Sequence, residues 1–157
     1  MHGILVTLHV LAAAVWLGGT VALVFVAVPV VRTLEGAARA HALRTLGRRW
    51  RPLGWGAAGV LVCSGVALAH HEGALHPGVL LHTSFGQVLL VKSVLTAGLL
   101  GTAALHDFVL GPRLAREIRE RRPPTSRRRL VLVGWTSFTL SVVVPVLGVA
   151  LAELPPR

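Results

Sequence analysis

The basic residues of this 157-residue chain are confined almost entirely to two short segments, and the sequence around them is apolar. Fourteen of its sixteen lysines and arginines fall within residues 32–51 and 113–129. Short loops rich in Arg and Lys stay on the cytoplasmic side of a membrane. Two such loops between apolar segments therefore predict a chain that crosses a bilayer four times, with both termini on the outer side.

A helix needs about 20 apolar residues to cross the hydrocarbon core of a bilayer. Four segments meet this requirement: about residues 3–31, 53–72, 79–110 and 130–152. The sequence predicts an all-α membrane protein, an up-down-up-down bundle of four transmembrane helices in one domain over residues 1–157. Its arginines lie in loops between spans, and this placement argues against a nucleic-acid partner despite the net charge of +10.

Smaller features predict how the spans begin and end. The alanine- and arginine-rich residues 34–50 are expected to form a short surface helix on the cytoplasmic face. Gly111-Pro112 is expected to end the third span, and Pro155-Pro156 the fourth, because proline cannot donate the next helical hydrogen bond. No internal repeat is evident.

The predicted topology places most of the histidines on the outer side. Six of the eight lie there or in the outer part of a span: His2, His9, His70, His71, His76 and His82. Neutral imidazole suits copper, zinc, iron and nickel. We predict an outer metal site formed by His9, His70 and His71, and we expect His2, His76 and His82 to be ordinary interfacial or loop residues.

Several polar residues inside the spans are candidates for cofactor binding. His9 should lie roughly 9 Å below the start of its helix, and Lys92 roughly 15 Å from the outer end of the third span. Placing Lys at such a depth costs about 2.5 to 3.5 kcal/mol. No carboxylate is expected at the depth of Lys92, which predicts a neutral amine, a polar cavity or an anion that the chain does not encode.

Two further residues complete the candidate set. Trp16 lies seven residues after His9 and shares its helix face, where core packing is favoured over a role at the site. His106, next to Asp107, shares a helix stripe with Lys92 and is a candidate for an inner proton-handling or ligand site, with an interfacial pair as the alternative.

Three segments resemble the CopD family of copper-resistance membrane proteins. They are HVLAAAVWLGG at residues 9–19, RRWRPLGW at 48–55 leading to CSG at 63–65, and FGQVLLVKSVL at 85–95. The resemblance covers about residues 8–113 and marks His9, Trp16, Gly18 and Lys92. A first-span His with a third-span Lys is also similar to the HemJ-type protoporphyrinogen oxidases, membrane bundles associated with haem b.

These resemblances leave three functions open. The first is a protein of the bacterial cytoplasmic membrane that binds or passes copper at its outer end. The second is a haem b membrane redox protein, in which His9, with His70 or Lys92, lies near the iron, or Lys92 pairs with a propionate. The third is a noncatalytic assembly subunit, with a second copy or another membrane subunit as partner. Whether the chain is an enzyme is left open. Soft ligands for Cu(I) are limited to Met1 and Cys63, so the donor set favours His-bound Cu(II) or another metal centre.

Overall fold

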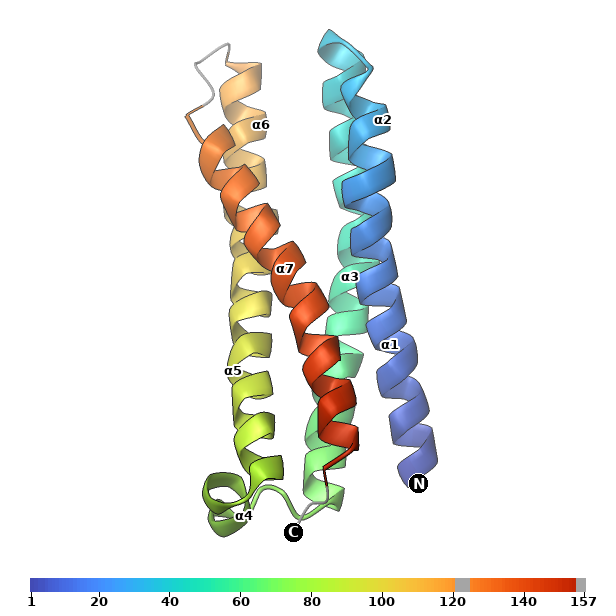
Figure 1. The fold of residues 1–157 in the computed structure, drawn as a ribbon. Helices are drawn as coiled ribbons and strands as arrows, with labels where there is room; N and C mark the ends of the chain where they lie inside the picture. The colour runs from blue at the N-terminus through green and yellow to red at the C-terminus, as the bar shows by residue number, and fades with distance from the viewer. Residues whose placement is uncertain (121–124, 155–157) are drawn as a thin grey trace.

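The computed structural model describes residues 1–120 and 125–154, which form helices joined by short turns (Figure 1). Four helical stretches are long and apolar enough to cross a membrane by length and composition, at His2–Arg32, Gly36–His71, Ser84–Glu117 and Arg127–Ala152. The prediction of an all-α four-helix membrane protein is confirmed. In full, the elements are α1 (His2–Ala22), η1 (Leu23–Ala27), α2 (Val28–Arg32), α3 (Gly36–His71), α4 (Pro77–His82), α5 (Ser84–Ala104), η2 (Leu105–Leu110), α6 (Gly111–Arg119) and α7 (Arg127–Ala152).

The helices are arranged as two antiparallel hairpins (Figure 1). α1 packs along α3, α5 packs along α7, and the contact of α1 with α7 joins the hairpins. One end of the bundle holds the start of α1, the end of α7 and the short helix α4, and we call it the terminal end. The other end holds α2, α6 and the arginine-rich segments, and we call it the basic end.

Two predictions about where helices begin and end are wrong. α3 runs without a break from Gly36 to His71, through Pro52, so residues 34–50 do not form a separate surface helix. Alanine and arginine are strong helix formers, and one proline removes only one hydrogen bond from a helix of 36 residues. The third stretch likewise continues past Pro112 as α6. The predicted stop at Pro155-Pro156 lies outside the described residues.

The helix continues past Pro112 because a π-helical segment precedes it. The Gly111 N–H bonds to the His106 carbonyl, five residues back. In a π-helix each N–H bonds to the carbonyl five residues earlier in the chain. Pro112 has no N–H, so the carbonyl of Asp107 lacks its helical partner. The Arg51 guanidinium of α3 donates to this carbonyl. A side chain of the neighbouring hairpin therefore replaces the hydrogen bond that proline cannot make.

The buried core is small and lies at the middle of the bundle. Trp16 of α1 packs with Ala58 of α3 and with Leu99 and Ala103 of α5, and these four form the buried apolar cluster. Leu140 of α7 is partly buried and packs against it. The outward faces instead carry large apolar side chains that are exposed, as expected for helices surrounded by lipid. Ile4, Val94 and Val149 are examples, each with an exposed fraction of 67–69%.

The two hairpins repeat one sequence pattern at a separation of 83 residues, which sequence analysis missed. The motif Phe-Val-x-x-Pro stands at residues 25–29 and again at 108–112. The motif Gly-Val-Ala-Leu-Ala stands at 65–69 and again at 148–152. In both hairpins the first helix carries a π-helical segment just before this proline, and the second helix carries the glycine-led motif near the terminal end. Equivalent positions of the hairpins can therefore be compared residue by residue.

Candidate functional site

A cluster of metal-ligand side chains lies at the terminal end, where α1 begins and α3 ends. One ring nitrogen each of His2 and His71 and one carboxylate oxygen of Glu72 all lie within 4.8 Å of one another. His2 Nδ1 is 3.4 Å from Glu72 Oε1, and the two imidazole centroids are 5.4 Å apart. Within residues 1–120 and 125–154, no other three His, Cys, Asp or Glu side chains converge this closely. We call these three residues the terminal cluster.

The terminal cluster shares one residue with the predicted metal site. His71 belongs to both, while His70 is exposed beside it and His9 lies further along α1. His9 and His70 as metal ligands stay a prediction. Sequence analysis did not include His2 and Glu72, although an antiparallel hairpin brings the start of its first helix to the end of its second. That topology was the signal available for finding them.

His9 is half-buried and directed at α3 rather than at the terminal cluster. Its Nδ1 lies 2.9 Å from Ser64 Oγ. The Ser64 hydroxyl donates to the Val60 carbonyl at 2.6 Å, so its oxygen accepts from His9 Nδ1–H. This hydrogen bond leaves the lone pair on His9 Nε2 available, the form in which histidine binds a metal or accepts a hydrogen bond.

Lys92 is half-buried on α5 and directed at α7. A Cβ atom placed on Gly148 would lie only 3.0 Å from Lys92 Nζ, so the glycine leaves room for the ammonium group. In the described part of the chain, no carboxylate forms an ion pair with Lys92. The structure thus places Lys92 beside α7 and His9 beside α3, each next to a glycine of its own hairpin.

Trp16 lies in the core, where its indole N–H donates to Ser141 Oγ at 3.0 Å. Ser141 in turn donates to the Ser137 carbonyl at 2.8 Å. The Trp16 ring meets the Trp55 ring edge-on, at 6.4 Å between centroids. Trp16 therefore links α1 to α3 and α7, in agreement with the core packing favoured by the sequence.

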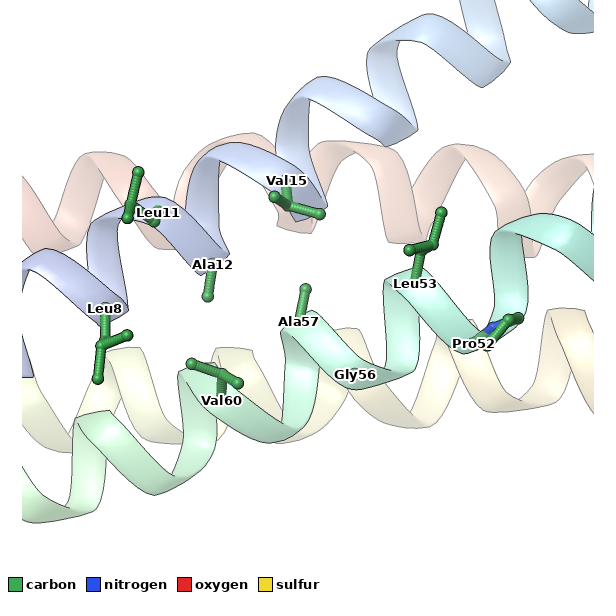
Figure 2. Close-up of a pocket in the computed structure, with 9 residues that line it drawn as sticks. All are labelled: Leu8, Leu11, Ala12, Val15, Pro52, Leu53, Gly56, Ala57 and Val60. Carbon is green, nitrogen blue, oxygen red and sulfur yellow. The ribbon is translucent and has the colours of Figure 1, made fainter.

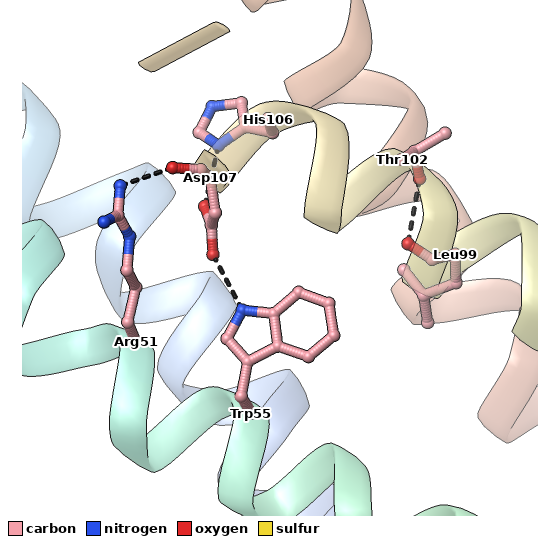
Figure 3. Close-up of polar contacts among 6 residues, drawn as sticks. All are labelled: Arg51, Trp55, Leu99, Thr102, His106 and Asp107. Carbon is pink, nitrogen blue, oxygen red and sulfur yellow. Dashed lines mark hydrogen bonds and ion pairs between the residues drawn. The ribbon is translucent and has the colours of Figure 1, made fainter. Parts of the chain in front are cut away.

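His106 belongs to a polar network at the basic end (Figure 3). The Asp107 carboxylate lies 3.0 Å from His106 Nδ1 and accepts from Trp55 Nε1 at 3.2 Å. Arg51 donates to the Asp107 carbonyl and lies over the Phe108 ring, 5.4 Å from its centroid. The network ties α3 to η2, so it joins the two hairpins as well as holding an imidazole. Sequence analysis named His106 and Asp107 but missed Arg51 and Trp55.

An apolar groove of about 350 Å³ runs between α1 and α3 (Figure 2). It is lined by Leu8, Leu11, Ala12, Val15, Pro52, Leu53, Gly56, Ala57 and Val60. None of these residues offers a metal ligand or a charge, and the groove suits apolar material such as lipid acyl chains. The candidate metal-ligand and charged side chains described above therefore lie outside this groove.

The four long helices, the polar side chains on them and the terminal cluster define the class of protein. It is a helical membrane protein with four spans and a cluster of metal-ligand side chains at one end. Residues 44–152 match the family model described as copper resistance protein D. Because the match covers more than half of the chain, the chain belongs to the copper resistance protein D family. The matched residues include Lys92, His71 and Glu72, whereas α1 with His9 precedes them. No curated protein and no solved structure matches the chain.

Proposed function

We propose that this protein handles copper at a membrane and that the terminal cluster is its copper site. The observation that carries the proposal is the convergence of His2, His71 and Glu72 donor atoms within 4.8 Å in a member of a copper-resistance family. Two imidazoles and one carboxylate form a nitrogen and oxygen donor set, which binds Cu(II) more strongly than the other divalent first-row metals. Glu72 also offsets part of the charge of the ion.

The proposed site belongs on the outer side of the bacterial cytoplasmic membrane. The terminal cluster lies at the opposite end of the bundle from the arginine-rich segments, and these segments favour the cytoplasm. The exterior is also the oxidising side, where Cu(II) persists. Copper bound there is held away from the cytoplasm, which suits a resistance function.

Reporter fusions should test this orientation. A reporter active only outside the cytoplasm should be active after Ala152 and inactive within α6, because the reverse topology would translocate both arginine-rich segments. A reporter active only in the cytoplasm should give the opposite pattern. Cytoplasmic activity after Ala152 would contradict the orientation and place the terminal cluster on the inner side.

Copper titration should test the site itself. We expect Cu(II) to bind the detergent-solubilised protein saturably, and His71→Ala, His2→Ala and Glu72→Gln each to raise the dissociation constant about tenfold or more, because each removes one of three ligands. Isothermal titration calorimetry measures the constants. The matched controls His76→Ala and His82→Ala, exposed histidines near the same end, should leave them unchanged.

The variant His9→Ala/His70→Ala separates the terminal cluster from the site predicted by sequence. Full Cu(II) affinity in this variant, with loss in His71→Ala, would support His2, His71 and Glu72 as the ligands. Loss of affinity in His9→Ala/His70→Ala with none in His2→Ala and Glu72→Gln would move the site to the predicted triad. An absence of saturable binding in the wild-type protein would overturn copper binding at this end.

A further inference from the structure

The apolar groove between α1 and α3 lies open on the surface of the first hairpin (Figure 2). A second groove of about 530 Å³ continues it toward the terminal end and shares Leu8, Gly56 and Val60 with it. A Cβ atom placed on Gly56 would meet no atom within 4 Å, so the space beside this glycine is open. Open apolar space on the surface of a membrane span is filled by apolar material, because lipid rather than water surrounds it.

Two arginines stand at the basic end of the apolar groove. Residues four apart share a helix face, so Arg49 lies one turn before Leu53 on the face of α3 that lines the groove. Arg48 has the same relation to Pro52. Both arginines are exposed, and neither forms an ion pair within residues 1–120 and 125–154. A ligand that extends along this face therefore meets apolar walls first and then two guanidinium groups without a carboxylate partner.

The second hairpin shows which of these features are specific to the first. At a separation of 83 residues, larger side chains replace the small ones of the groove: Leu95 stands for Ala12, Thr139 for Gly56 and Leu140 for Ala57. The two arginines are replaced as well, Arg48 by Val131 and Arg49 by Leu132. The small groove residues and the arginines beside them therefore occur together, in one hairpin of the pair.

We propose that the first hairpin binds one anionic phospholipid, with an acyl chain in the apolar groove and the phosphate at Arg49 and Arg48. The rise of α3 from Arg49 to Val60 is roughly 16 Å. One leaflet contributes about 15 Å of hydrocarbon, half of the core of the bilayer, so an acyl chain from the leaflet at the basic end matches this length. A guanidinium group binds phosphate oxygens through paired hydrogen bonds. The site does not rest on the proposed copper function.

Lipid titration followed by native mass spectrometry should test the phosphate contact. Phosphatidylglycerol and phosphatidylcholine with identical acyl chains are each added to the full chain in detergent. We expect one phosphatidylglycerol to bind about tenfold or more tightly than phosphatidylcholine, and Arg48→Gln/Arg49→Gln to remove this preference, because only the first lipid carries a net negative charge. The matched control Arg113→Gln/Arg116→Gln removes two exposed arginines of α6 and should keep the preference. Equal binding of the two lipids by wild-type protein, or equal losses in the two double variants, would overturn the proposal.

Filling the apolar groove should test the position of the acyl chain. Gly56→Leu places a side chain in open space, so it should weaken the binding of both lipids and leave the fold intact. Thr139→Leu, at the equivalent exposed position of the second hairpin, is the matched control and should bind lipid as the wild-type protein does. Val60→Phe fills the same groove and provides the comparison if Gly56→Leu fails to fold.

Two results of the groove variants would contradict the lipid site. Unchanged phosphatidylglycerol binding in folded Gly56→Leu or Val60→Phe protein would place the acyl chain elsewhere. A wild-type dimer that carries no lipid, and that either variant dissociates, would assign the groove to a second copy of the chain.

Discussion

Replacing Trp16 with alanine should destabilise the bundle by about 3 to 5 kcal/mol, the usual cost of removing a large buried aromatic side chain. The exposed fraction of Trp16 is 8%, and the residue packs with the buried side chains of α3 and α5. The change opens a cavity in the core cluster and removes the donor that bonds to the buried Ser141 of α7. The free energy of unfolding in mixed detergent micelles, followed by circular dichroism, measures the effect.

The variant Trp16→Phe separates the hydrogen bond of Trp16 from its packing. Phenylalanine fills much of the space but cannot donate to Ser141, so the expected loss is about 1 kcal/mol for that bond together with a smaller packing term. Trp135→Ala on α7 is the matched control, because 52% of Trp135 is exposed. Equal losses for Trp16→Ala and Trp135→Ala would contradict the assignment of Trp16 to the core.

The number of spans and the all-α fold could be predicted because both follow from composition along the chain. Apolar stretches near the length of a bilayer crossing, separated by two arginine-rich segments, leave few alternatives to a helical bundle with four spans. The helix ends were harder to predict. Pro52 and Pro112 are helix breakers by local preference, yet both lie within continuous helical stretches. At Pro112, the π-helical register and the Arg51 donor from another helix compensate, and neither is visible in the local sequence.

Some of the candidate site residues could likewise be predicted from the sequence, and others could not. Lys92 and His9 were found because an ionisable residue within an apolar span is unusual whatever its neighbours are. His2 and Glu72 look ordinary in sequence, since exposed polar residues near helix ends are common. They become a candidate site only through the antiparallel pairing of α1 and α3, which sets them beside His71. Donor convergence of this kind depends on helix pairing and rotation, which local periodicity does not determine.

The repeat of the two hairpins explains why polar residues of different chemistry lie at matching depths. Residues 9 and 92 share a position but differ in side chain, as do Trp16 and Leu99, both of which are buried in the core cluster. The two hairpins also differ in the polar residues of their π-helical segments. The π-helical segment η2 carries His106 and Asp107, whereas η1 carries only apolar residues. The repeat thus places polar side chains at one shared position, residues 9 and 92, while the polar residues of η2 have no counterpart in η1.

Replacing Gly86 with alanine should destabilise the protein by about 3 kcal/mol, the upper part of the usual range for overpacking. A Cβ atom at Gly86 would lie 2.1 Å from the Val79 carbonyl oxygen and 2.6 Å from Leu80 Cα. Both are backbone atoms of α4, so no side-chain rotation can relieve the clash and α4 must move away from α5. That movement also strains the Thr83 cap, whose hydroxyl donates to the Val79 carbonyl and accepts from the Gly86 N–H.

Gly101→Ala on the same helix is the matched control, because no atom lies within 4 Å of a Cβ placed there. Alanine in a helix is more stable than glycine by roughly 0.5 to 1 kcal/mol, so this variant should be neutral or slightly more stable. Thermolysin cleavage near Leu80 and Leu81, read by mass spectrometry, should become faster in Gly86→Ala and stay unchanged in Gly101→Ala. Equal cleavage and equal thermal midpoints in the two variants would contradict the close approach of α4 to α5 at Gly86.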